Sequence, residues 1–181
     1  MSHSTLEFRG LPVAVSEDSQ RFAYLEKERR INVVKLMTGQ EIMSLDVEHL
    51  GCAAMSPDGT RLAGMRSERD VVVWKIPSGT QIARFDAQLE NFPIHLEFID
   101  NQRLAFTAYT KVIIWNLQDG SSHTIEIGKD QTHSVRVSPD GKTLVIGTGW
   151  FPLIWPHPSG GGPPKIPPGK AILWDIEART R

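Results

Sequence analysis

The chain has 181 residues, 40% hydrophobic and 23% charged, so it can bury a core of ordinary size and is not composed like a disordered chain. Twenty Lys and Arg residues oppose 21 Asp and Glu residues, and this balance excludes a bulk positive field for nucleic acid or an anionic membrane. The single cysteine, Cys52, excludes a disulfide framework and a cysteine-based zinc site within one chain.

The chain begins with a strand pattern and a first repeat unit. We expect a short strand over residues 3–9 and a unit of four strands over 11–46. This unit carries the turn sequence Ser-Glu-Asp-Ser at 16–19, followed by Arg-Phe-Ala. Its third strand ends on Val34.

The second unit, over 51–86, displays the pattern most completely. Four β-rich runs are predicted, at Gly51–Met55, Arg61–Met65, Val71–Ile76 and Thr80–Phe85. The first two are separated by the turn Ser-Pro-Asp-Gly, in which Asp58 can accept hydrogen bonds from its own turn and Gly59 can take a positive φ. No stretch has a helical period, so the fold class is all-β.

Two further units follow, over 92–127 and 133–181. The Ser-Pro-Asp-Gly turn returns with Asp140 and Gly141, 82 residues after its first occurrence, which is twice a repeat of about 41. The unit between them carries the degenerate turn Ile-Asp-Asn-Gln at 99–102. The chain is therefore interpreted as one domain of about four repeats.

A second marker repeats independently of the turns. Trp74, Trp115 and Trp174 each end a run of mostly apolar residues, the third run of its unit. The first two are 41 residues apart and the last two 59 apart, so the fourth unit carries an insertion of about 18 residues. We expect each indole to lie as an apolar plate between neighbouring units, with its N–H bonded to a buried partner.

The Ser-Pro-Asp-Gly turns and the final Trp-Asp pair at 174–175 resemble the WD-repeat family, and the resemblance covers nearly the whole chain. It implies a β-propeller whose blades are four-stranded antiparallel sheets, here about four in number. The Gly-His pair that usually opens a blade is absent, and Glu68 and Tyr109 stand where the family usually has a turn Asp. The repeats are therefore degenerate. The resemblance implies a non-catalytic scaffold for protein or peptide partners.

The sequence does not determine how the blades close into a propeller ring. The last unit has no run for a fourth strand, whereas residues 3–9 resemble the fourth strands of the inner units. We expect this N-terminal strand to complete the last blade, which removes a free sheet edge. The four blades could close alone, pair with a second copy of the chain, or belong to a longer protein that completes the ring.

The insertion at 149–170 is the first candidate for partner binding. It lies between the second and third strands of the last unit and holds seven of the twelve prolines. Prolines favour an extended backbone, on which large aromatic side chains can act as interface anchors. The candidate residues are Trp150, Phe151, Trp155 and His157. The alternative is that these aromatic groups fold back onto the blade edge.

The same end of the blades receives the other turns between second and third strands. They contribute the further candidates Arg29, Arg30, Arg69 and Tyr109. The turns are mixed in charge, so they form either a solvated rim or a surface that orients a partner.

No motif for catalysis or for a cofactor is found. The six histidines share no metal-ligand spacing, and there is neither a phosphate-binding loop nor a nucleophile elbow. We therefore expect no enzyme activity, no cofactor and no nucleic-acid partner. The absence of a signal-peptide pattern or a long apolar run predicts a cytoplasmic chain without a membrane partner. The alternative function is a small-ligand or metal-assisted pocket at the propeller axis, which converging His, Asp or Glu side chains would favour.

Overall fold

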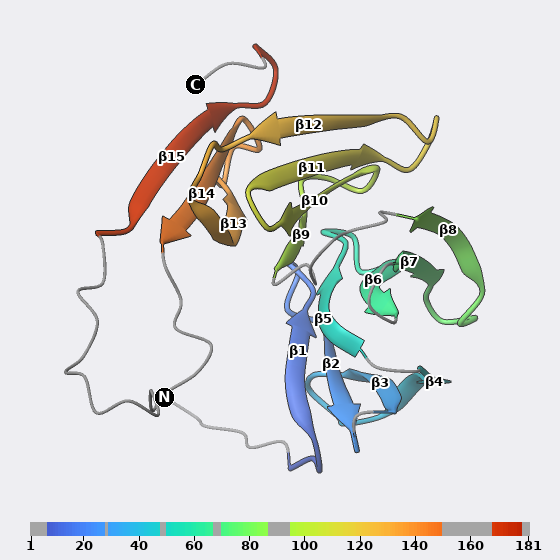
Figure 1. The fold of residues 1–181 in the computed structure, drawn as a ribbon. Helices are drawn as coiled ribbons and strands as arrows, with labels where there is room; N and C mark the ends of the chain where they lie inside the picture. The colour runs from blue at the N-terminus through green and yellow to red at the C-terminus, as the bar shows by residue number, and fades with distance from the viewer. Residues whose placement is uncertain are drawn as a thin grey trace, which may run out of the picture.

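The computed structural model describes residues 7–27, 29–47, 50–66, 70–86, 95–149 and 168–178, and in these residues every regular element is a strand. The first three sheets each have four antiparallel strands hydrogen-bonded in chain order, and the last has three, in the order β13-β14-β15. The sheets follow one another along an arc (Figure 1). The all-β class and the organisation into about four blades are confirmed. Within the described residues no helix has the length and apolar character needed to cross a membrane.

The strands are short, as the spacing of the turns predicted. The first two blades are β1 (Leu11–Val15), β2 (Arg21–Glu26), β3 (Arg30–Lys35) and β4 (Glu41–Asp46), then β5 (Leu50–Met55), β6 (Arg61–Arg66), β7 (Asp70–Lys75) and β8 (Gln81–Asp86). The last two are β9 (Leu96–Phe98), β10 (Arg103–Ala108), β11 (Lys111–Asn116) and β12 (Ser122–Glu126), then β13 (Gln131–Val137), β14 (Thr143–Gly149) and β15 (Lys170–Asp175). The first strands of successive blades, β1, β5, β9 and β13, contact one another along the inside of the arc (Figure 1).

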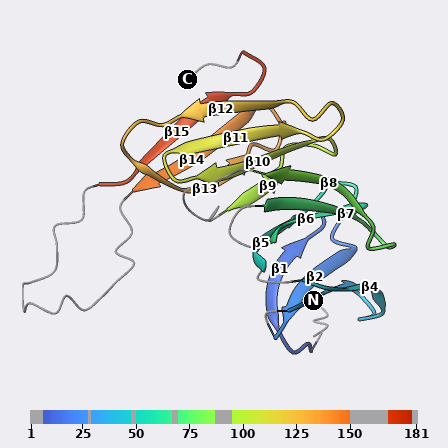
Figure 2. The ribbon, with the colours of Figure 1, turned by 45° about the vertical axis from the view of Figure 1, so that its right-hand side comes forward.

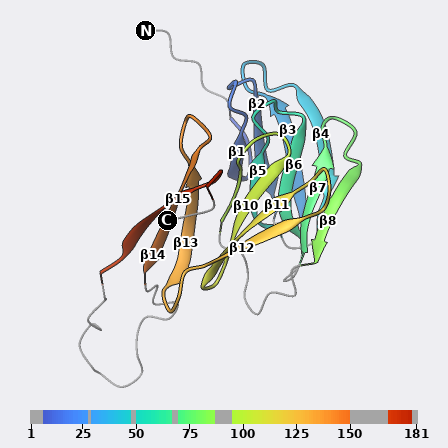
Figure 3. The same ribbon diagram turned by 90° about the horizontal axis from the view of Figure 1, so that it is seen from above.

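The blades stack face to face, and the core is divided accordingly (Figures 2 and 3). Each junction between neighbouring blades has its own apolar cluster, one between blades 1 and 2, one between 2 and 3, and one between 3 and 4. Trp74 and Trp115 are buried in the first two clusters, and Trp174 packs against the third. Because the middle strands are covered on both faces, Val71, Val72 and Val73 are all buried without alternating with polar residues.

The turns between first and second strands are built alike in three blades. In blade 2 the Oδ1 atom of Asp58 accepts hydrogen bonds from the Ser56 hydroxyl at 2.7 Å and from the backbone N–H of Thr60 at 2.9 Å. The Ser56 oxygen in turn accepts the N–H of Arg61 at 2.9 Å, and Gly59 has a φ of 65°. Blade 1 repeats these bonds around Asp18 and blade 4 repeats them around Asp140. A Ser and an Asp two residues later thus form the same turn in three blades.

Hydrogen bonding holds these turn carboxylates in their charged form. The hydroxyl bonds of Ser16 and Ser138 are the largest cause that lowers the pKa of Asp18 and of Asp140, respectively. At Asp58 burial raises the pKa, but the bonds from Thr60 and Ser56 outweigh it, so that pKa also lies below its ordinary value.

Blade 4 differs from the expectation at its tryptophan, Trp174. The Nε1 atom of Trp174 is buried and, within the described part of the chain, has no hydrogen-bond acceptor. The Nε2 atom of His123 across the blade junction is likewise buried without a partner there, with the two ring centroids 6.1 Å apart. The expected buried acceptor for this indole is therefore not found among the described residues.

The N-terminal segment is described only from Glu7. Residues Glu7–Gly10 do not form a strand, and the ring of Phe8 lies 4.8 Å from that of Phe22 and 5.2 Å from that of Tyr24, on blade 1. The remainder of the expected strand over 3–9 lies outside the described residues. Its pairing with the last blade stays a prediction.

Replacing Asp58 by Ala removes the acceptor of the turn, and we expect the free energy of unfolding to fall by about 0.5–1 kcal/mol at pH 7 in urea titrations. Because the pKa of Asp58 is lower in the folded chain, its contribution is complete above the unfolded pKa and is lost as pH falls through the folded value. The difference between wild type and Asp58→Ala should therefore shrink in acid. Glu17→Ala, an exposed carboxylate of the first turn, is the control.

Trp174→Phe keeps an aromatic plate at the third junction and removes the unpaired N–H. We expect the free energy of unfolding to stay the same or to rise by up to about 1 kcal/mol, since a buried donor without an acceptor is costly. Trp174→Ala removes the packing as well and should lower it by about 2 kcal/mol. A Phe variant as unstable as the Ala variant would contradict the assignment of an unpaired donor. Thermal and urea unfolding measure the free energy of unfolding of both variants.

Candidate functional site

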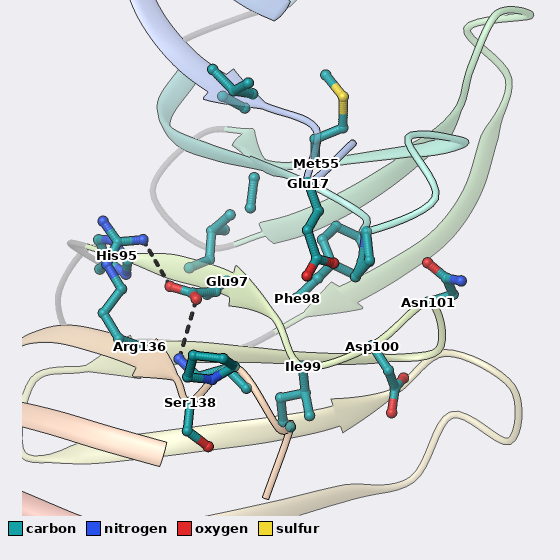
Figure 4. A pocket seen from close by; sticks show the side chains of 18 of the residues that line it. Glu17, Met55, His95, Glu97, Phe98, Ile99, Asp100, Asn101, Arg136 and Ser138 are labelled. Atoms are coloured by element: carbon teal, nitrogen blue, oxygen red, sulfur yellow. Dashed lines mark hydrogen bonds and ion pairs between the residues drawn. The ribbon is translucent and has the colours of Figure 1, made fainter. Parts of the chain in front are cut away.

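The inner strands of all four blades line one open cavity of about 700 Å³ (Figure 4). We call it the inner groove and define it by its lining segments, which are residues 13–15 and 17 of blade 1, 53–55 and 57 of blade 2, 95–101 of blade 3 and 136–141 of blade 4. Its position follows from the fold, because the first strand of each blade lies on the inside of the arc. The groove reaches the turns between first and second strands, at the opposite end of the blades from the rim that the sequence favoured.

A polar group is built into one wall of the groove, between blades 3 and 4. The carboxylate of Glu97 accepts a hydrogen bond from the Arg136 guanidinium at 2.8 Å and one from the backbone N–H of Val137 at 3.2 Å (Figure 4). The Glu97 side chain is 22% exposed, whereas that of Arg136 is 68% exposed. The carboxylate is thus fixed in place by the neighbouring blade, while the guanidinium keeps contact with solvent.

His95 directly precedes strand β9, the strand that carries Glu97, and is half-buried. Its backbone N–H bonds the Thr107 hydroxyl at 3.1 Å, and its Nδ1 atom is buried without a partner among the described residues. Burial is the main cause that lowers the pKa of His95, the positive charge of Arg136 adds to this, and Glu97 opposes it. Burial thus favours the neutral form of the imidazole.

Carboxylates outnumber cationic groups along the groove. Glu17, Glu97, Asp100 and Asp140 line it together with a single guanidinium, that of Arg136. Between them lie apolar side chains, of which Val15 is 51% exposed. This arrangement suits an extended segment that carries apolar and basic side chains.

A second hollow, of about 730 Å³, lies at the predicted rim between blades 1 and 2. Arg29 and Arg30 line it, with Trp74 beneath them. The Nε atom of Arg30 lies 2.9 Å from Oδ1 of Asp46 in an exposed ion pair, which holds that guanidinium at the edge of the hollow. Two of the residues predicted from the sequence, adjacent along the chain, thus line the same hollow.

Tyr109 is 45% exposed and takes a φ of 58° in the turn between β10 and β11. Its carbonyl oxygen accepts bonds from the N–H and the hydroxyl of Thr132, at 2.6 and 2.8 Å. The residue thus ties blade 3 to blade 4 through its backbone and leaves its ring partly accessible. The remaining sequence candidates, Arg69, Trp150, Phe151, Trp155 and His157, lie outside the described residues.

The sequence reasoning missed the polar wall of the inner groove. A signal was present, because Glu97 is a charged residue between Leu96 and Phe98 in a first strand, and Arg136 follows it by 39 residues, close to one repeat. Equivalent positions of neighbouring first strands meet on the inside of the arc, so opposite charges one repeat apart predict an ion pair there.

Among the described residues no group of three or more His, Cys, Asp or Glu side chains has the arrangement to hold a metal ion. Burial raises the pKa of the Cys52 thiol to about 12, so it is protonated at neutral pH and is a weak nucleophile.

No protein-family model and no curated protein sequence matches the chain. Solved structures do. The β-propeller domain of Cps50 (Swd1) from Myceliophteria thermophila is similar with a TM-score of 0.70 at 10% identity, over 99% of this chain and 56% of that one. The WD40 repeats of RRP9 give 0.64 at 19% identity, over 80% and 47%, and U3-55K gives 0.69 at 17%, over 97% and 52%. At these identities the likeness concerns the fold, and the chain spans about half the length of each solved structure.

The charge around His95 can be tested by titration. Arg136→Ala removes the positive charge that lowers the pKa of His95, so the midpoint followed by NMR of the imidazole protons should rise; Glu97→Gln should lower it. Since the folded pKa is below the unfolded one, the neutral imidazole contributes stability that is lost as pH falls below the unfolded value. His95→Gln identifies the resonances. Equal midpoints in all three chains would show that Arg136 and Glu97 do not act on the ring.

Proposed function

Because the chain has the WD-repeat β-propeller fold, we propose that it is a non-catalytic protein-interaction module that holds a peptide segment of a partner protein in the inner groove. Fold alone does not determine function, so the proposal depends on the site. The observation that carries it is one open cavity to which all four blades contribute their first strands and first turns.

The groove has the properties that recognition of an extended segment requires. Its walls belong to hydrogen-bonded strands and turns, so little ordering of the protein is needed on binding. Apolar side chains supply contact area, and the excess of carboxylates selects a partner with Lys or Arg residues. The fixed carboxylate of Glu97, whose side chain is 22% exposed, offers an acceptor to a polar group of the ligand.

The opposite rim is a second docking surface within the same proposal. Arg29 and Arg30 would orient an acidic part of the partner above Trp74, and Tyr109 would add an aromatic contact. Arg69 and the insertion residues Trp150, Phe151, Trp155 and His157 extend this surface as anchors. A partner that uses both ends would be held across the blades.

The alternative function, a small-ligand pocket at the axis, is favoured by one observation. His95 and Glu97 both line the groove, as converging acidic and histidine side chains of such a pocket would. The groove is open and lined by four blades, however, and these properties suit a peptide better than a small molecule that must be enclosed.

Selection from a random peptide library on the 181-residue chain tests the proposal. We expect enriched peptides to contain Lys or Arg, and Glu17→Lys to weaken their binding at least about tenfold, since it reverses an exposed charge of the groove. Dissociation constants are measured by fluorescence anisotropy.

Two control variants separate the surfaces. Arg29→Glu combined with Arg30→Glu alters the rim, and Trp150→Ala combined with Trp155→Ala alters the insertion; both should change the affinity of the selected peptides less than about twofold. Loss of binding in either control, with Glu17→Lys unaffected, would move the site to that end of the blades. Failure to enrich any peptide would overturn the proposal.

A further inference from the structure

The two ends of the blade array differ in how their faces are covered. Each blade has a leading face, which packs against the next blade along the chain, and a trailing face, which packs against the preceding one. Three junctions use three leading and three trailing faces. Among the described residues, the leading face of blade 4 and the trailing face of blade 1 have no neighbouring blade.

The leading face of blade 4 exposes positions that are buried in the other blades. Leu173, paired with Val145, is 61% exposed. Of its equivalents, Val33 and Val73 are fully buried and Ile114 is partly buried. Ala171 is exposed as well, whereas the residues in its place are fully buried in all three preceding blades, namely Ile31, Val71 and Val112. The sheet is therefore built for a neighbour at the positions where the described residues supply none.

The trailing face of blade 1 carries large side chains. Phe22 and Tyr24 stand there, Phe22 being buried at 7% exposure, and Phe8 packs against both rings and is the exposed ring of this face, at 38%. At the internal junctions Ala23, Ala63 and Ala105 lie on leading faces and Trp74, Trp115 and Trp174 on trailing faces. Blade 4 exposes Ala171 and Leu173 on its leading face and blade 1 exposes the ring of Phe8 on its trailing face, so both faces offer apolar contact area to a neighbour.

We propose that two copies of this chain associate, the leading face of blade 4 of each copy packing on the Phe8–Phe22–Tyr24 face of the other, so that eight blades form a closed ring. Each open face is then used once, and the two contacts are related by a twofold axis, which ends the assembly at two copies.

Light scattering on the 181-residue chain during size-exclusion chromatography tests the association. We expect a mass of twice 20.2 kDa. Leu173→Glu places a charge in the apolar contact and should weaken the dimer at least about 100-fold, giving the mass of one chain, while circular dichroism is unchanged because the leucine is exposed within one copy. Met37→Glu is the control, since Met37 is 73% exposed in a turn of blade 1, and it should remain a dimer.

Cross-linking tests which faces meet. A chain with Phe8→Cys is mixed with a chain with Leu173→Cys and oxidised, and we expect disulfide-linked pairs that contain one of each. Links between two Leu173→Cys chains would indicate a contact of blade 4 with blade 4 and overturn the proposal. A wild-type mass of one chain, a dimer unaffected by Leu173→Glu, or a mass that grows without limit as in an open filament would also overturn it. None of these outcomes depends on peptide binding in the inner groove.

Discussion

Face-to-face burial of one sheet against the next is the interaction on which the rest of this structure depends. A single four-stranded sheet of such short strands cannot hide both of its apolar faces, and the chain solves this by repetition. Each junction has a separate apolar cluster, so stability is distributed over three contacts between neighbours rather than gathered in one centre. The inner groove exists because this stacking brings the first strands of the blades side by side.

The turns set the register on which the stacking relies. A serine hydroxyl and an aspartate fix the chain reversal in blades 1, 2 and 4 with the same few hydrogen bonds. In blade 3 the turn is held by Asp100, which accepts the N–H groups of Gln102 and Arg103. Each of the four turns between first and second strands contains an Asp carboxylate, although the residues around it differ. The reason is that each turn has backbone N–H groups that need an acceptor.

Much of the fold could be predicted from the sequence because its signals are local. The Ser-Pro-Asp-Gly turns and the Val-Val-Val-Trp run lie within one or two strands, and their spacing reports the repeat directly. The ion pair of Glu97 with Arg136 has a signal only in the comparison of two repeats, and the Trp174 donor that lacks an acceptor among the described residues has none in its own strand. Both depend on which side chain of the next blade stands opposite, and this is set by the stacking geometry and not by either residue's own strand. The aromatic insertion at 149–170 was predicted as a docking element, and this stays a prediction.

The inner groove has a thermodynamic consequence that follows from its four walls. Within the array each blade is coupled to its immediate neighbours, so such a chain can in principle unfold from an end, one blade after another. A segment bound along the groove touches blades that do not otherwise meet, and it is released when any of them opens. Binding would then join four weakly linked units into a single cooperative one, and the sharpness of the unfolding transition would itself report occupancy.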